Sequence, residues 1–265
     1  IVRDLSQWPA EILVEPIGVQ KIAAGAGVCF GQRLGRRASA TVYAAAKRGV
    51  IQHEVTHAYC VLAFGSSGDT WLSEGVAELG NYWTRDRDGV QIATQVLAYL
   101  RTERQRKPLS SIVASGDQPA GDWQDYAWRW SICHLLAQSP NYRDRFQQLA
   151  IASMTGKQDA TFDVAFNPVS KRIAFEYGQF LSSLEPGYRV DLCAWPWDAQ
   201  FAPQPKGQSK TVKIKARGGW QASGVRLEPG KKYAISSEGT WMIANGVSVD
   251  ANGDASQRGR LIAAT

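Results

Sequence analysis

His53-Glu54-Val55-Thr56-His57 predicts a metal-binding helix. Two histidines four residues apart on a helix lie about 40° apart around its axis, so both imidazoles can bind one ion. Tetrahedral zinc is well served by two neutral imidazoles and one carboxylate, with the fourth position left to water. Glu54 lies about 100° from His53 around the helix. It is therefore expected to accept a proton from a metal-bound water rather than to bind the metal.

The five-residue motif alone also occurs on unrelated amphipathic helices that place two polar residues on one face. A second segment favours the metal interpretation: Trp71-Leu72-Ser73-Glu74-Gly75-Val76-Ala77-Glu78. Glu74 follows His57 by seventeen residues, enough for a helix end, a loop and the start of another helix. The small residues Gly75 and Ala77 allow the two helices to approach closely. The pattern predicts that Glu74 is the third ligand.

This combination resembles the gluzincin metallopeptidases, the clan of thermolysin and aminopeptidase N, in which a glutamate on a downstream helix completes the zinc site. Residues 71–75 are similar to the WLxEG form of the aminopeptidase-N-like branch. The resemblance implies one catalytic Zn²⁺ bound by His53, His57 and Glu74, with Glu54 as the general base. It also implies a zincin-like fold.

Glu78 lies four residues after Glu74 and is similar in position to an acid that orients a ligand histidine in thermolysin-like enzymes. Such a partner fixes the imidazole tautomer and raises its basicity. The alternative is an exposed helix carboxylate with no role at the site.

The aminopeptidase-N-like branch carries a tyrosine that stabilises the oxyanion, in a YxKGxxxLxxL-like context on a later helix. Tyr126 stands fifty-two residues after Glu74 in a similar pattern, although the Lys-Gly pair is absent. The resemblance implies that the Tyr126 phenol donates to charge that develops in the transition state. The alternative is a core aromatic residue. His134, on the same predicted helix, is expected to be a packed, hydrogen-bonded histidine.

The GxMEN motif, whose glutamate holds the substrate amino terminus in those aminopeptidases, is absent from residues 31–50. An exopeptidase needs a charge for the terminal ammonium, since an unpaired buried charge is costly. This absence favours an endopeptidase. The β-branched run at 40–45 is expected to form an edge strand to which an extended peptide adds.

Composition agrees with a folded protein of one large domain, or of one medium and one small domain. No apolar stretch in the 265 residues is long enough to cross a bilayer. The chain opens at Ile1 without a methionine or a hydrophobic signal region, which suggests a processed product that is secreted, periplasmic or at the cell surface. The net charge of +6 is modest and its basic residues are scattered, so nucleic acid is not an expected partner. Attraction to acidic glycans is an alternative.

Cys29, Cys60, Cys133 and Cys193 are spaced too widely for a CxxC metal site. Their even number suits one or two disulfides in an oxidising compartment. Helical geometry favours Cys60–Cys133, which would leave Cys29–Cys193. The alternative is four buried thiols.

Hydrophobic periodicity predicts an α+β protein whose first domain covers 1–198, with a small β layer in 1–45. Helices are expected in six segments: 47–64, 71–84, 89–106, 123–138, 141–154 and 170–184. A strand layer followed by clustered helices is the zincin arrangement, with the metal helix packed on the sheet.

A proline-containing segment at 199–210 is expected to be a linker. Beyond it, 211–265 shows strand patterns at 211–216, 227–236 and 259–263. This part resembles the first half of a galactose-binding bacterial lectin sandwich, with a similar xPGxxxxIxxxGxW stretch. The resemblance allows Ca²⁺ in this module, with no assignable ligands. A piece of fifty-five residues with open strand edges is marginal alone, so we expect either that the chain as given is cut short or that the missing strands come from elsewhere.

The sequence thus predicts a secreted zinc endopeptidase that acts on extracellular proteins or glycoproteins. An aminopeptidase, a zinc-containing glycan-binding protein without catalytic activity, and a structural protein with an accidental motif are the alternatives.

Overall fold

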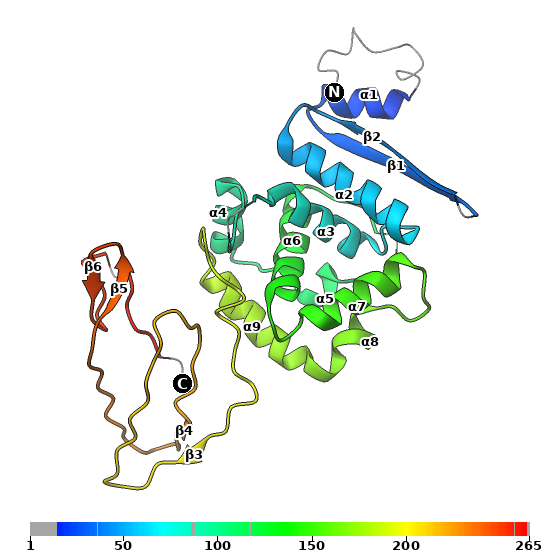
Figure 1. Ribbon diagram of the computed structural model, residues 1–265. Coiled ribbons are helices and arrows are strands. Elements are labelled where there is room, and N and C mark those ends of the chain that lie inside the picture. Colours follow the sequence, from blue (N-terminus) through cyan, green and yellow to red (C-terminus); the bar gives the residue numbers. More distant parts are fainter. Residues whose placement is uncertain (1–14, 36, 86–87, 117, 257, 264–265) are drawn as a thin grey trace. The chain divides into compact units, whose positions relative to one another are not determined.

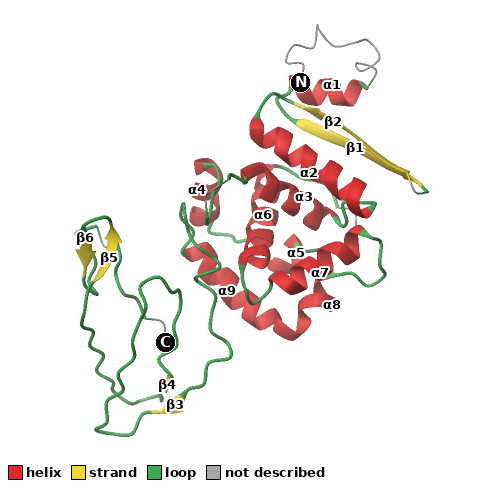
Figure 2. Cartoon of the chain, in the orientation of Figure 1, coloured by secondary structure: helices red, strands yellow, loops and turns green. Residues whose placement is uncertain are grey.

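The computed structural model describes residues 15–263 apart from 36, 86–87, 117 and 257. The chain divides into two compact units, the first ending at Ala194 and the second beginning at Trp195. Helices dominate the first unit, whereas the second is mostly loop with short strands (Figure 2). The expected mixture of helices and small sheets is present. The part of the predicted β layer before residue 15 lies outside the described residues.

The first unit opens with a short helix and a hairpin. Helix α1 (Pro16–Ala23) was not predicted, although Pro16 at its first turn and the Glu15 carboxylate, which accepts from the Ile17 amide, are ordinary helix-start signals. Strands β1 (Gly27–Leu34) and β2 (Arg37–Ala44) pair antiparallel along their whole length. β2 contains most of the predicted 40–45 strand.

Helix α2 (Arg48–Phe64), in which the metal motif is predicted, lies between the hairpin and α3 (Thr70–Tyr82) (Figure 1). Both helices begin and end within two residues of the predicted bounds. Gly65 ends α2 with a φ of 105°, a conformation that glycine adopts at little cost. On the sheet side, a Cβ at Gly31 would come within 2.7 Å of the Val61 side chain. The missing side chain therefore lets the hairpin pack directly on α2.

Helix α6 (Trp123–Gln138) packs against α3 and forms the centre of the hydrophobic core. Its start is fixed by Asp122, whose carboxylate accepts from the Gln124 and Asp125 amides. Around it are α4 (Thr94–Thr102), α5 (Leu109–Ile112), α7 (Arg143–Met154), α8 (Phe162–Phe166), the 3-10 turn η2 (Asn167–Val169) and α9 (Ser170–Ser182).

Helix α4 is shorter than the predicted 89–106. At its N-terminal side, Val90 exchanges backbone hydrogen bonds with residues 187 and 188, so this segment pairs with a distant loop instead of continuing the helix. At the C-terminal side, the Glu103 carboxylate accepts from the Gln105 amide in a local turn. The hydrophobic periodicity of residues 89–106 gives no sign of either of these competing interactions.

The second unit has two small strand pairs. β3 (Ala202–Pro203) pairs parallel with β4 (Val225–Arg226), and β5 (Trp241–Ala244) pairs antiparallel with β6 (Val247–Val249). β3 falls within the predicted linker.

The strands predicted at 211–216, within 227–236 and at 259–263 are wrong, since the structure has none there, and of 227–236 only the turn at 229–230 is present. The Gln221 side chain satisfies both the amide and the carbonyl of Lys215, which removes the need for a partner strand. No sandwich forms among the described residues.

The four cysteines are free thiols in the structure, so neither predicted disulfide is present. Cys133 is fully buried and its Sγ lies against Gly75 of α3, rather than facing Cys60 of α2. Cys193 lies beside Tyr188, far along the chain from Cys29. Burial raises the pKa of Cys60 and of Cys133, as expected for packed, unreactive thiols. Among the described residues, no helix combines the length and apolarity that a membrane span requires.

Gly75 allows α3 to approach α6, because a Cβ there would lie 2.9 Å from the Arg129 carbonyl oxygen and would collide with the Cys133 thiol. We therefore expect Gly75→Ala to destabilise the protein by about 1–3 kcal/mol despite the better helix propensity of alanine. Gly178 in α9 is the matched control, since a Cβ there meets nothing within 4 Å. Gly178→Ala should stabilise by about 0.5–1 kcal/mol. Urea unfolding of both variants measures the difference, and equal effects would contradict this packing.

Candidate metal centre

Three side chains from α2 and α3 converge: His53, His57 and Glu74, which together could hold a metal ion. The Nε2 atoms of His53 and His57 are 3.1 Å apart. Glu74 Oε2 lies 3.3 Å from Nε2 of His53 and 3.5 Å from Nε2 of His57. The three side chains are mostly buried, with exposed fractions of 12%, 14% and 16% in the same order. Two separate sequence segments therefore deliver three donor atoms to one point.

The two helices meet closely because small residues line their contact. A Cβ at Gly80 of α3 would collide with the Thr56 hydroxyl, and a Cβ at Gly49 of α2 would collide with the Asn81 side chain. On α2 these contacts lie at Gly49, one turn before His53, and at Thr56, between the two histidines. Bulkier residues would separate the helices and move Glu74 away from the imidazoles.

The far nitrogen of each imidazole has a partner. Nδ1 of His53 lies 2.9 Å from the Glu78 carboxylate, which accepts the Nδ1 hydrogen. Nδ1 of His57 lies 3.2 Å from the Ser73 hydroxyl. Such contacts fix ring orientation and leave each Nε2 free to bind a metal.

Glu78 is buried, with 7% of its surface exposed, rather than a solvated carboxylate on the helix surface. Both of its oxygens accept hydrogen bonds from the Asn81 side chain, at 3.2 and 3.0 Å. Ser73 was not singled out in the sequence. It is buried on α3, directly before Glu74, but neither its burial nor its contact with His57 can be seen in the local sequence.

The close approach of the imidazoles and carboxylates shifts the pKa values of His53 and Glu74 in the metal-free protein. Burial by itself would lower the pKa of His53, but hydrogen bonds to Glu74 and Glu78 outweigh it and raise the pKa to about 9. Burial would raise the pKa of Glu74, yet the two imidazoles lower it to about 2. A proton on His53 thus balances the buried carboxylates in the space where a metal would lie.

Glu54 does not belong to the group of three. Its side chain is directed toward β1, where a Cβ at Gly27 would lie 2.5 Å from its Cγ and 2.8 Å from its Oε1. Burial raises the pKa of Glu54, although the nearby His53 and His57 oppose this shift. The carboxylate is therefore close enough to interact electrostatically with both histidines, and its proton affinity is increased.

Tyr126 is brought to the same place by α6, with its ring centroid 5.9 Å from that of His53. Burial raises the pKa of its phenol, and the charge of Glu74 adds to this effect. The phenol therefore remains a hydrogen-bond donor at neutral pH. Among the described residues no hydrogen-bond partner is found for its hydroxyl.

His134 lies in the core rather than at the site. Its ring stacks on those of Trp130 and Phe180, with distances between ring centroids of 4.9 and 6.0 Å. Burial lowers its pKa to about 4. The packed position of His134 agrees with the sequence prediction. The predicted hydrogen bond is missing at its Nε2 atom, which is buried without a partner among the described residues.

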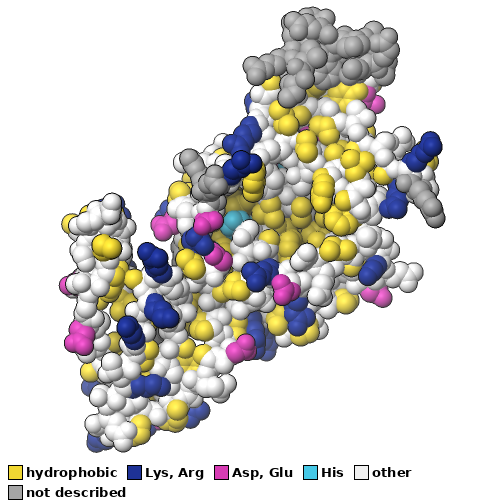
Figure 3. All heavy atoms as spheres, in the orientation of Figure 1, with side chains coloured by type: hydrophobic (Ala, Val, Ile, Leu, Met, Phe, Trp, Pro, Cys, Tyr) yellow, Lys and Arg dark blue, Asp and Glu magenta, His cyan; other side chains and the backbone are white. Residues whose placement is uncertain are grey.

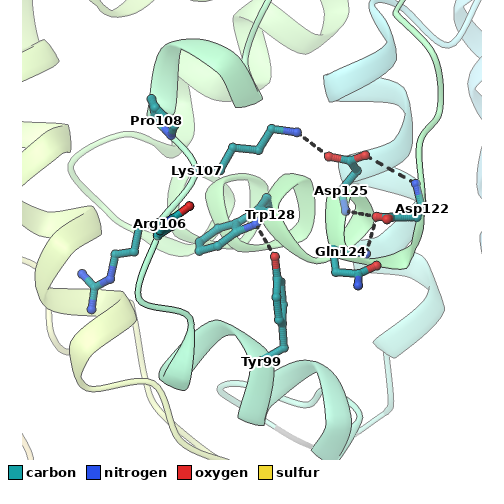
Figure 4. Close-up of a pocket in the computed structure, with 9 residues that line it drawn as sticks. Tyr99, Arg106, Lys107, Pro108, Asp122, Gln124, Asp125 and Trp128 are labelled. Carbon is teal, nitrogen blue, oxygen red and sulfur yellow. Dashed lines mark hydrogen bonds and ion pairs between the residues drawn. The ribbon is translucent and has the colours of Figure 1, made fainter.

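An open hollow of about 590 Å³ lies beside the first turns of α6. Figure 4 shows Tyr99 directed toward the Trp128 indole, which donates to its hydroxyl at 3.0 Å, and Lys107 directed toward Asp125. Trp128 lies about 160° from Tyr126 around the helix. The hollow therefore opens on the face of α6 opposite the tyrosine and contains none of the three ligands.

Charge on the surface is dispersed. On the visible face, Lys and Arg side chains are scattered, with Asp and Glu among them (Figure 3).

Comparisons with protein-family models, with curated proteins and with solved structures each found no match.

The Glu78 contact generates a prediction about metal affinity. Glu78→Gln removes the charge that polarises His53 while preserving shape, so divalent metal binding should weaken about 10–100-fold. Isothermal titration of the metal-free protein measures this change. The control is Glu185→Gln, at an exposed position after α9, which should bind like the wild type. Equal affinity of both variants would show that Glu78 does not support the ligand.

The raised pKa of His53 predicts proton release on metal binding. Its folded value of about 9 exceeds the ordinary 6.5, so the ring is protonated at pH 7 in the metal-free protein and must lose a proton to bind metal. Affinity should therefore rise about tenfold per pH unit toward pH 9 and then level off. Titrations at pH 7 in buffers of different ionisation enthalpy should show about one proton released. Metal binding without proton release would contradict the assignment.

Proposed function

We propose that this chain is a zinc-dependent endopeptidase of the gluzincin type. The observation that carries the proposal is the spacing of the donor atoms: 3.1, 3.3 and 3.5 Å between the two imidazole nitrogens and the Glu74 oxygen. Zinc–ligand distances near 2.0–2.1 Å in a tetrahedron require about 3.3–3.4 Å between ligand atoms. The arrangement has the size of a tetrahedral zinc site with one vertex left over.

The donor set also has the right electronic character. Glu74 Oε2 is buried and, apart from the two imidazole nitrogens at 3.3 and 3.5 Å, has no hydrogen-bond donor near it among the described residues. A buried carboxylate oxygen with so few donors is costly, and a cation at this point would satisfy it. With Nδ1 of each ring in contact with a side chain of α3, both Nε2 atoms are directed at the same space. The residues present therefore fit zinc.

The chemistry of peptide hydrolysis can be assigned to the chain's own residues. Bound zinc would supply a Lewis acid and a water molecule of lowered pKa. Glu54, next to the ligands, would accept the proton of the attacking water and deliver it to the leaving amine, consistent with its raised pKa. Tyr126 would donate its hydroxyl hydrogen to the oxyanion that forms on the scissile carbonyl.

Endopeptidase action is supported by the composition of the hairpin next to Glu54. β1 and β2 contain no Asp or Glu, so they provide no carboxylate for a substrate ammonium group. Each strand pairs with the other and has an edge without a partner strand among the described residues. An extended peptide could add to such an edge, and Gly27 places β1, rather than the predicted 40–45 run, against the general base. Secretion and glycosylated substrates remain predictions from the sequence.

The test combines metal analysis with cleavage of a peptide library whose amino termini are blocked. Wild-type protein should contain one zinc per chain and cleave blocked peptides internally. Glu54→Gln should retain zinc and lose about 10²–10⁴-fold in kcat. The exposed Glu185→Gln variant is the control and should remain active.

Cleavage restricted to free amino termini would favour the aminopeptidase alternative. Zinc without cleavage would favour a binding protein. A fully active Glu54→Gln protein would refute the mechanism.

A further inference from the structure

Arg129 is a buried cation that the proposed mechanism does not yet use. It lies on α6 one turn after Tyr126, and only 7% of its surface is exposed. Among the described residues no carboxylate lies within ion-pair distance of its guanidinium. Burying a charge without an opposite charge is costly, so other polar groups must stabilise the guanidinium of Arg129.

Two backbone carbonyls take the place of an acid. Nη1 of Arg129 donates to the Ala120 carbonyl, and Nη2 donates to the Pro119 carbonyl at 3.0 Å. The planar guanidinium thus binds both oxygens at once, a geometry that a lysine ammonium cannot reproduce. Arg129 ties the segment before α6 to the body of the helix.

The same guanidinium covers the proposed oxyanion donor. Its Cζ lies 5.9 Å from the centroid of the Tyr126 ring, within the range of a cation–π contact. The Tyr126 hydroxyl has no hydrogen-bond partner among the described residues, so the direction of the ring depends on its neighbours. His53 and Arg129 are the two side chains whose contacts with the ring are resolved.

The segment held by Arg129 also connects the two helices that form the site. The Thr70 hydroxyl, at the start of α3, donates to the Gln118 carbonyl, and the Gln118 amide donates back to the same hydroxyl, both at 3.0 Å. Residues 118–120 are thereby fixed to α3, which carries Glu74, and to α6, which carries Tyr126. Arg129 makes the connection to α6.

We propose that Arg129 is a positioning residue that holds the Tyr126 ring, and the segment 118–120 behind it, in the orientation from which the phenol reaches the oxyanion. This inference rests on the proposed peptidase function. Arg129 itself touches neither the substrate nor the metal ligands in this role. Its loss should therefore lower kcat and leave zinc content and KM nearly unchanged.

The experiment is a double-mutant cycle on zinc-loaded protein with an internally cleaved, blocked peptide. Arg129→Met alone should lower kcat about 10–100-fold, and Tyr126→Phe alone by a similar or larger factor. In the Tyr126→Phe background, Arg129→Met should change kcat less than about threefold, because its effect acts through the missing hydroxyl. A general structural role would lower kcat by the same factor in both backgrounds.

Arg129→Lys keeps the charge at the buried position and tests the geometry separately from folding. It should retain zinc and stay folded at the assay temperature, as unfolding curves can check, yet show reduced kcat at unchanged KM. A second readout is the binding of a phosphinic peptide, whose tetrahedral anion resembles the intermediate. Its affinity should fall in Arg129→Lys by the factor lost in kcat/KM, while a small hydroxamate that binds only the metal should be unaffected.

The outcomes separate the two claims. Equal effects of Arg129→Met in both backgrounds, or wild-type kcat in Arg129→Lys, would overturn the positioning role and leave the peptidase proposal intact. An inactive wild-type protein with full zinc content would overturn both.

Discussion

The structure depends on the close contact of two helices that brings three donor atoms to one point in a mostly buried space. Two imidazole nitrogens and a carboxylate oxygen are unfavourable neighbours unless a cation, either a proton or a metal, lies between them. Glycines at the contact of α2 and α3 permit the approach, and Glu78 and Ser73 hold the rings from behind. The packing of the helices, the orientation of the rings and the charge of Glu74 therefore all favour a cation at this point.

The surrounding architecture is consistent with this centre. The hairpin packs on α2 through positions without side chains and places Gly27 against Glu54, whereas α6 approaches α3 at Gly75 and carries Tyr126 to the ligands. The proposed base thus lies where α2 meets the hairpin, and the proposed oxyanion donor comes from α6, which packs on α3. Arg129 extends the arrangement, because it links the tyrosine to a segment that is also fixed to the start of α3.

The sequence predicted the parts of this fold that local pattern controls. The bounds of α2, α3 and α6 followed from periodicity, and four-residue spacing was enough to bring His53 and His57 together. Ser73 and Arg129 were missed because their roles arise from contacts between distant segments. The same limitation explains the absent Cys60–Cys133 pair, since Cys133 faces α3. It also explains the strands wrongly predicted after residue 210, where alternation is present but the partner strands that stabilise it are not.

The central claim is that one zinc ion binds between His53, His57 and Glu74. Diffraction data from crystals of the purified protein, collected on both sides of the zinc absorption edge, test it most directly. The account predicts a single anomalous peak about 2.0–2.2 Å from Nε2 of both histidines and from Oε2 of Glu74. A peak elsewhere, or none in zinc-loaded crystals, would contradict it.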